Sequence, residues 1–487
     1  MVPNPSELDD TPSVLKLPKL PPTDIRGPKR AAVMGTLGNV LSFFREPIGT
    51  MLSLQQRFGN LVAIADRDPA MLVAFGGEHN RAVLSDTRLF HHWSEIPIPV
   101  PPDSAPMRLG QSLISTNGET HRRNRRLMMP AFAKGRIERY LPDIVDVTEQ
   151  ALARIEPGAT VDLAAAMVEL SMHVALRCLF GVEPEPGTPH VGVLAGRYTK
   201  ALLSPGAIMF PYSLPGTPYR RFLQTASELE DSLRALVARR RHHPGGADVL
   251  SALIDAHDDE DGSLTDGELV GQAALLFIAG HETTAFTLSW TLFLLSQHPR
   301  VMQELGEEIE ATLRGAPPTA DQLGSMPRLD AVIKESQRLF PATPFMFFRR
   351  ATAPFELGGH ELPEGASVIL SPLISHRLPE VFPEPKRFRP ERWEGRQPTL
   401  YEYLPFGAGP RMCIGAGFAS QTLRVVLPML LSRIRPSLVS GAKVSRKVAG
   451  VTMGPRYGLP MRIMAPGDAL PAPEAVPGDV HELVELG

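Results

Sequence analysis

The chain has 487 residues, 43% hydrophobic and 21% charged, so a large buried core is possible and global disorder is excluded. Lys and Arg number 50 against 53 for Asp and Glu, and the resulting net charge of −3 argues against a general nucleic-acid binder. The two cysteines, Cys178 and Cys413, exclude a disulfide framework and any zinc or iron–sulfur site that needs several cysteines.

No segment of the sequence indicates export or membrane insertion. The longest apolar runs, such as 273–279 and 425–431, fall well short of the roughly 20 residues that a spanning helix needs. The N-terminus opens with prolines and acidic residues instead of a basic start and an apolar core, so it is not a secretory signal. We therefore expect a cytoplasmic protein with reduced thiols and no membrane span.

Mostly helical patterns follow one another along the chain, with a smaller β portion. A hairpin is predicted over 61–75, and short strands near 355–357 and 367–370. Helices are predicted over 134–180, over 223–241, from 266 to about 297, from 327 to just before Pro341, and from near Cys413 onward. The helix over 266–297 is apolar on most faces and is expected to be buried.

The acidic loop before this long helix has two interpretations. Asp259 and Asp261 match positions of a calcium-binding loop, but His257 stands where the first carboxylate belongs. Thr265 and Glu268 have the spacing of a capping box, in which each side chain bonds the other's backbone N–H. We favour the capping box over calcium binding.

No linker inside the chain forces a division into several domains. We expect one large domain over residues 31–465, mainly α with a small β portion. The preceding residues, 1–30, are rich in Pro and charge and are expected to lie extended on the surface. The tail, 466–487, is Pro-rich and acidic and is expected to be disordered.

One cysteine follows a glycine-rich loop and precedes a predicted helix, in the segment 406–415. N–H groups and the positive dipole end at a helix start lower the pKa of a thiol. The glycines allow close approach to something flat and large, and Arg411 can reach an anion on the same body. Cys178 has the surroundings of an inert buried thiol, but Cys413 does not.

This segment resembles the haem-binding loop of the cytochrome P-450 family, the haem-thiolate monooxygenases, whose pattern F-x-x-G-x-R-x-C-x-G it matches at every fixed position. The resemblance covers about residues 30–465. It implies a single large domain with a buried haem b and Cys413 as the axial ligand of the iron. It also implies haem contacts from Phe406, Gly407 and Gly415.

A carboxylate and a guanidinium, Glu335 and Arg338, share one face of the helix that follows Pro327. By the resemblance this pair is buried and is completed by Arg392, and the three residues lock the loop that presents Cys413. Their implied role is structural. One departure from the family is Leu378, where an Asp is usual.

The long helix carries the segment Ala279-Gly280-His281-Glu282-Thr283-Thr284. A glycine inside a helix costs about 1 kcal/mol against alanine, so Gly280 is expected to open room beside the helix. A threonine can bond back to an upstream carbonyl and bend the helix. The resemblance implies that Thr283 hydrogen-bonds dioxygen and that Glu282 takes part in proton delivery.

A haem carries two carboxylates, and burying them without cations is costly. His121 and Arg125 lie one helical turn apart and face the same way. By the resemblance they bind these carboxylates together with Arg411 and one further arginine. Arg349 and Arg350 are the candidates for it, and counting along the chain favours Arg349.

The implied reaction inserts one oxygen atom from O2 into a substrate and consumes two electrons. The chain after Cys413 is too short for a flavin reductase, so we expect a ferredoxin and a ferredoxin reductase as separate donors to a monomer. Arg122, Arg123 and Arg126 form either a docking patch for such an acidic donor or merely a solvated face.

The residues expected to contact substrate are mainly apolar, so we predict a lipophilic substrate: a fatty acid, terpenoid, steroid or polyketide. They are Phe277, Ala279, Phe345, Met346, Val451 and Thr452. The alternatives are a peroxygenase or a non-hydroxylating rearrangement enzyme, which the presence of Glu282 and Thr283 disfavours, and a haem-binding sensor without turnover. Consumption of dioxygen that depends on an electron donor separates an enzyme from a sensor.

Overall fold

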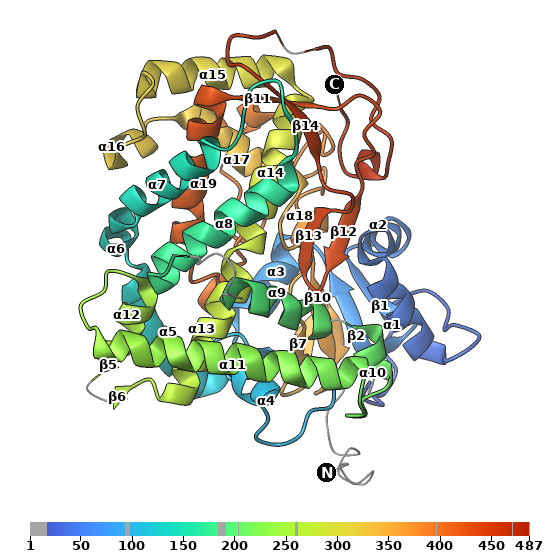
Figure 1. The fold of residues 1–487 in the computed structure, drawn as a ribbon. Helices are drawn as coiled ribbons and strands as arrows, with labels where there is room; N and C mark the ends of the chain where they lie inside the picture. The colour runs from blue at the N-terminus through green and yellow to red at the C-terminus, as the bar shows by residue number, and fades with distance from the viewer. Residues whose placement is uncertain are drawn as a thin grey trace.

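The computed structural model describes residues 17–92, 98–183, 191–202, 204–258, 262–395, 397–469 and 471–486. Helices dominate it and the β portion is small, as the sequence predicts (Figure 1). The helices are α1 Gly35–Arg45, α2 Pro47–Phe58, α3 Gly77–Ser85, α4 Ala105–Gly110, α5 Gly118–Met128, α6 Lys134–Arg139, α7 Leu141–Leu152, α8 Leu163–Phe180, α9 Val191–Leu202, α10 Pro205–Met209, α11 Pro218–His242, α12 Val249–Ile254, α13 Asp266–Gly280, α14 Glu282–Ser296, α15 Pro299–Leu313, α16 Ala320–Leu323, α17 Pro327–Leu339, α18 Pro372–Ser375 and α19 Ala416–Arg433.

The main sheet has five strands in the order β1-β2-β10-β7-β3. β10 runs parallel to β2, and the other neighbouring pairs are antiparallel. The strands are β1 Leu61–Ala65, β2 Asp68–Ala74, β3 Phe90–His92, β4 Thr160–Asp162, β5 His257–Asp258, β6 Gly262–Ser263, β7 Arg349–Ala351, β8 Phe355–Leu357, β9 His360–Leu362, β10 Ser367–Leu370, β11 Arg435–Leu438, β12 Arg446–Ala449, β13 Thr452–Pro455 and β14 Pro460–Met464. The predicted hairpin over 61–75 is confirmed as β1 and β2.

The long apolar helix predicted over 266–297 is two helices that meet at His281. α13 ends at Gly280 and α14 begins at Glu282. The capping box at the start of α13 is confirmed, because the Thr265 N–H donates to Glu268 Oε2 over 2.8 Å and the Glu268 N–H donates to Thr265 Oγ1 over 3.3 Å. Asp259 and Asp261, on which the calcium alternative depends, lie outside the described residues.

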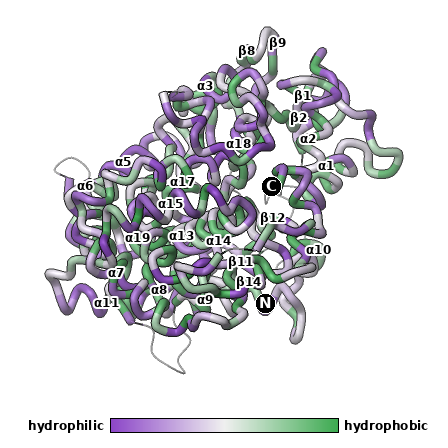
Figure 2. The backbone as a smooth tube through the Cα atoms, turned by 90° about the horizontal axis from the view of Figure 1, so that it is seen from above, coloured by the Kyte–Doolittle hydropathy of each residue, from purple (hydrophilic) through white to green (hydrophobic). Residues whose placement is uncertain are grey.

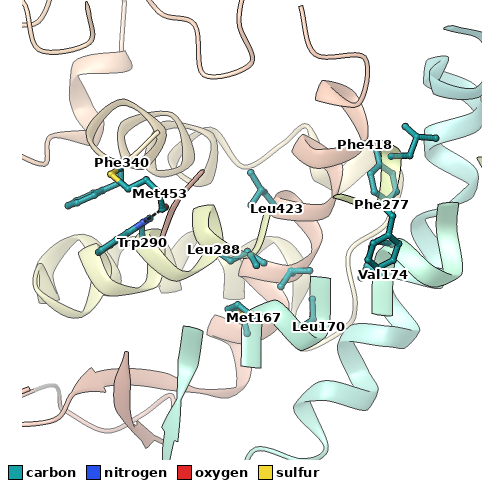
Figure 3. Close-up of a cluster of buried hydrophobic side chains, with 14 of the residues drawn as sticks. Met167, Leu170, Val174, Phe277, Leu288, Trp290, Phe340, Phe418, Leu423 and Met453 are labelled. Atoms are coloured by element: carbon teal, nitrogen blue, oxygen red, sulfur yellow. Dashed lines mark hydrogen bonds between the residues drawn. The ribbon is translucent and has the colours of Figure 1, made fainter. Parts of the chain in front are cut away.

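α14 passes through the centre of the core and packs against α8, α15, α17 and α19. Seen from above, α13 and α14 lie near the middle of the molecule (Figure 2). The Trp290 ring stacks on Phe340 at 4.5 Å between centroids, and its Nε1 donates to the carbonyl of Met453 over 3.1 Å (Figure 3). The same close-up also shows Phe277 of α13 and Phe418 of α19 among the buried side chains.

α8 is, in the part of the chain that the structure describes, the one helix long and apolar enough to cross a membrane. Of its 18 residues, 61% are buried inside the protein. It packs against α7, α12 and α14, so its apolar surface is used within the core.

The tail does not have the disorder expected from its composition. Leu483 and Val484 are fully buried, and Val480 is 1% exposed. Arg446 Nη2 pairs with Glu482 over 2.6 Å, and Arg377 Nη2 donates to the carbonyl of Leu483 over 3.0 Å. The expectation was wrong because a few apolar side chains in a polar segment are enough to hold it once a complementary surface is present.

At the other end of the chain, residues 17–30 lie along the β1–β2 hairpin. The Ala63 N–H donates to the carbonyl of Arg26 over 3.0 Å, and the Arg67 N–H to that of Ile25 over 3.1 Å. Ile25 is 2% exposed, so this extended segment is partly built into the core.

Candidate active site

A tight loop before α19 holds Cys413. The Cys413 N–H donates to the carbonyl of Phe406 over 2.9 Å, and the Gly407 N–H donates to that of Leu404 over 3.0 Å. Gly409 has a φ of +72°, and a Cβ there would collide with the carbonyl of Leu84 on α3. The glycine is therefore required twice, by its backbone angle and by the closeness of α3.

The Cys413 side chain is both accessible and closely surrounded by protein atoms. It is accessible to water by area, yet protein atoms surround it closely enough that burial raises the pKa of its thiol. The Gly415 N–H and the charge of Arg125 lower this pKa, as expected of a helix start, but burial outweighs them. Cys178 is 1% exposed and inert by comparison. A cysteine that is enclosed but accessible can ligate a metal ion bound inside the protein, because a thiol is deprotonated when it coordinates a metal.

The C-terminal end of α13 also has an accessible side. Ala279 is exposed although most residues before it on α13 are buried, and the Thr283 Oγ1 donates to the Ala279 carbonyl over 2.8 Å. Gly280 does not open room as predicted. A Cβ there would lie 3.4 Å from Leu179 Cδ1, at ordinary van der Waals contact, so the space beside this glycine is about that of a methyl group.

Buried cations collect around the cysteine loop. Arg349 is 7% exposed, and burial with the charge of Arg411 lowers its pKa to about 9. Burial and then the charge of Arg125 lower the pKa of Arg411 to about 10. Burial, followed by the charges of Arg411 and Arg125, lowers the pKa of His121 to about 4. The structure thus brings together four of the residues that the sequence selected.

These cations are not neutralised by the protein. Among the described residues, no carboxylate lies within ion-pair distance of Arg125, Arg349 or Arg411. Arg411 Nη2 instead donates to the Thr116 carbonyl and to Asn117 Oδ1, each over 2.6 Å, and its buried Nε has no partner. Arg349 is buried and Arg125 and Arg411 are half-buried, and withdrawing three guanidinium groups from water without counter-charge is unfavourable, so the cluster is suited to a dianion.

Strand register separates Arg349 from Arg350. Arg349 lies opposite Val368 on β10 and opposite His92 on β3. Because neighbouring residues of a strand point to opposite faces, Arg350 points away from the side of the sheet that Arg349 and His92 share. The structure therefore places Arg349, and not Arg350, in the cation cluster.

Sequence reasoning missed two residues of this region. His92 is 6% exposed, and burial together with the charge of Arg349 holds its pKa well below the usual range. Asn117 donates to the His92 carbonyl over 3.0 Å, accepts its N–H over 2.8 Å and accepts from Arg411. A lone histidine in a short strand and an asparagine before a helix give no signal in the sequence.

Glu335 and Arg338 form a fully buried ion pair behind the cysteine loop. Two parallel bonds of 2.9 Å join Arg338 Nε and Nη2 to the two oxygens of Glu335. The carboxylate also accepts from Arg392 Nε over 2.8 Å and from Trp393 Nε1 over 3.0 Å. Every donor meets an oxygen, so this pair escapes the cost of an unsatisfied buried charge.

His376 connects this network to the cysteine loop. Arg338 Nη1 donates to the His376 carbonyl over 3.0 Å, and His376 Nε2 accepts the N–H of Leu404, two residues before Phe406, over 2.9 Å. Burial and the charge of Arg338 lower the pKa of His376 to about 3, so the ring is neutral and Nε2 can accept. A chain of hydrogen bonds thus joins the buried ion pair to the cysteine loop, which gives the expected structural role a physical basis.

The residues expected to contact substrate separate into two groups. Phe277 is fully buried, with its ring 5.8 Å from Phe180, and Phe345 is 3% exposed and packs on Phe43, so both lie in the core. Helical spacing shows which side chains share a face but not whether that face is accessible. The accessible or half-buried members are Ala279, Met346, Val451 and Thr452.

Comparisons with known proteins agree with this geometry. A family model described as Cytochrome P450 matches residues 25–458. The chain is 33% identical over 441 residues to cyclooctat-9-en-7-ol 5-monooxygenase of Streptomyces melanosporofaciens, a match covering 87% of this chain and 94% of that one. It is 31% identical over 441 residues to pentalenene oxygenase of Streptomyces avermitilis, covering 88% and 95%. The solved structure of retinoic acid bound cyanobacterial CYP120A1 has the same fold, with a TM-score of 0.79, 24% identity, and coverage of 91% of this chain and 100% of that one.

Proposed function

This chain belongs to the cytochrome P450 family and is a haem-thiolate monooxygenase, and from that premise we propose that Cys413 ligates the iron of a haem b. The observation that carries the proposal is the cluster of buried cations without carboxylate partners beside an enclosed, accessible thiol. Arg125, Arg349 and Arg411, with His121, would hold the two haem carboxylates.

When bound, the haem supplies the activation of dioxygen, and donation from the thiolate favours cleavage of the O–O bond. The protein's part is to position protons and to exclude water. The Thr283 hydroxyl donates to the Ala279 carbonyl, which leaves its oxygen free to accept a hydrogen bond at the accessible face of the helix. Glu282 is half-buried and makes no ion pair within the described chain, so its carboxylate is available for proton delivery.

The substrate we propose is a lipophilic terpenoid. Ala279, Met346 and Val451, the apolar members of the accessible set, offer no charged group to a polar ligand. The two named Streptomyces relatives act on cyclooctat-9-en-7-ol and on pentalenene, as their names state. Both observations favour a substrate held by apolar contact.

Electrons would come from a separate ferredoxin and its reductase. The arginines on α5 considered for docking are less open than the sequence suggests, since Arg123 pairs with Glu268 and Arg126 with Asp258. Lys134, 92% exposed at the start of α6, pairs only at 3.8 Å with Glu138 of the same helix, and α6 packs against α19 on the cysteine side. We therefore propose that an acidic donor docks over α6.

A spectral titration tests the function. The purified haem-loaded protein is mixed with terpenoids, fatty acids and, as a control, nucleotides, and the shift of the haem Soret band is recorded. Terpenoids should shift it in a saturable way and nucleotides should not. A Cys413→Ser variant should lose the wild-type spectrum of the ferrous carbonyl complex, with Cys178→Ser unchanged. An unaltered spectrum in Cys413→Ser would overturn the assignment of the iron ligand.

A further inference from the structure

The break between α13 and α14 is occupied by a histidine ring. His281 is 6% exposed, and its Nδ1 lies 2.8 Å from the carbonyl oxygen of Phe277, four residues earlier. In a continuous helix this carbonyl would accept the backbone N–H of His281. Within the described part of the chain, no hydrogen bond of ordinary geometry runs from that N–H to a backbone carbonyl. The imidazole N–H of His281 therefore replaces its backbone N–H as the donor to the Phe277 carbonyl.

Two hydroxyls do the same on the following turn. Thr283 Oγ1 donates to the Ala279 carbonyl over 2.8 Å, and Thr284 Oγ1 donates to the Gly280 carbonyl over 3.2 Å. Position 282 is a glutamate, whose ionised carboxylate can only accept. Side chains of this segment thus satisfy three of the four carbonyls at the break, and the histidine is the first of them.

The histidine lies on the helix face opposite Ala279 and Thr283. At 100° per residue, Phe277 and His281 share one face of the helix, while Ala279 and Thr283 share nearly the opposite one. The His281 ring packs against the Phe277 ring at 4.9 Å between centroids, and Phe277 packs on Phe180 of α8 at 5.8 Å. A ring held this way cannot rotate out of its bond to the carbonyl.

We propose that His281 is a positioning residue: its Nδ1–H fixes the break between α13 and α14 and thereby sets the turn that presents the Thr283 hydroxyl and the Ala279 carbonyl. The inference rests on the proposed role of Thr283, but its structural half stands apart from turnover. It predicts that a donor at the place of Nδ1, and not the size of the side chain, keeps the break in position.

Three substitutions separate these properties. His281→Asn keeps an amide N–H near the position of Nδ1, His281→Gln moves its amide outward toward the position of Nε2, and His281→Leu keeps bulk without a donor. His298→Leu is the matched control, because His298 Nδ1 makes the same bond to the Leu294 carbonyl over 2.7 Å at the far end of α14.

The first measurement is hydrogen exchange, by mass spectrometry, of the amides of residues 278–285 in the haem-loaded proteins. Loss of a bond of this kind should speed exchange about fivefold in His281→Leu and His281→Gln, and leave His281→Asn and His298→Leu near the wild type. The second is the ratio of product formed to reduced nicotinamide consumed, which should fall severalfold in the same two variants while haem content stays unchanged.

Equal exchange in His281→Asn and His281→Leu, or no acceleration in either His281→Leu or His281→Gln, would overturn the proposal. If His281→Leu does not fold, the comparison of Asn with Gln decides. If the wild type forms no product at all, the proposed function fails while the exchange measurement still tests the role of the histidine.

Discussion

At the scale of single residues, charge without counter-charge is the most informative feature of the site. The sequence motif identified Cys413 and Arg411 because their spacing is rigid and local. It could not decide between Arg349 and Arg350, because two adjacent arginines differ only in the face of the strand they occupy, and that is set by pairing with β3 and β10. Sequence reasoning missed His92 for the same reason, because its place opposite Arg349 is set by the pairing of β3 with β7.

The two arginines make a matched pair of variants. Arg349→Met should speed haem dissociation by roughly thirtyfold, because it removes a charge-assisted bond worth about 2 kcal/mol to a buried carboxylate. Arg350→Met should change it less than twofold. The rate is measured by transfer of haem to an excess of a haem-scavenging protein. Equal rates in the two variants would contradict the assignment of Arg349.

At the scale of elements, the long helix and the ion-pair helix were predictable and the contacts between them were not. Apolar periodicity identified 266–297 as a buried helix, but its division at His281 depends on a ring that replaces a backbone bond. Spacing placed Glu335 and Arg338 on one face of α17, whereas the bridge through His376 joins segments 38 and 28 residues apart. Contacts of this length carry no local signature.

The bridging histidine should make stability depend on pH. Its folded pKa of about 3 is below the 6.5 of the unfolded chain. Between these values the unfolded state binds a proton that the folded state refuses, so the free energy of unfolding falls as the pH falls from 6.5 toward 3. The slope from this group is about 1.4 kcal/mol per pH unit.

His376→Gln isolates that contribution, because a glutamine oxygen can still accept the Leu404 N–H without titrating. Urea unfolding of both proteins at about pH 7 and about pH 5 should show a smaller acid loss of stability in the variant, by about 2 kcal/mol. Parallel losses in the two proteins would show that His376 is not buried in its neutral form.

At the scale of the whole molecule, the described segments near both ends of the chain pack onto the rest of the domain. Composition predicted an extended surface segment at one end and a disordered tail at the other. A count of prolines and charges does not show the surface against which a few apolar residues pack. Residues 17–30 pair with the β1–β2 hairpin, and the tail covers Arg377 and Arg446. Arg377 is 8% exposed, and burial lowers its pKa well below its usual range.

The tail is therefore predicted to be a structural part of the domain. Leu483→Ala should lower the free energy of unfolding by about 2–5 kcal/mol, because it leaves a cavity at a fully buried position. Glu485→Ala, two residues away with a side chain 61% exposed, should change it by no more than about 0.5 kcal/mol. Thermal unfolding of the haem-loaded proteins measures both. A melting temperature that does not respond to Leu483→Ala would mean that the tail is detached in solution, and Arg377 would then need another acceptor in place of the Leu483 carbonyl.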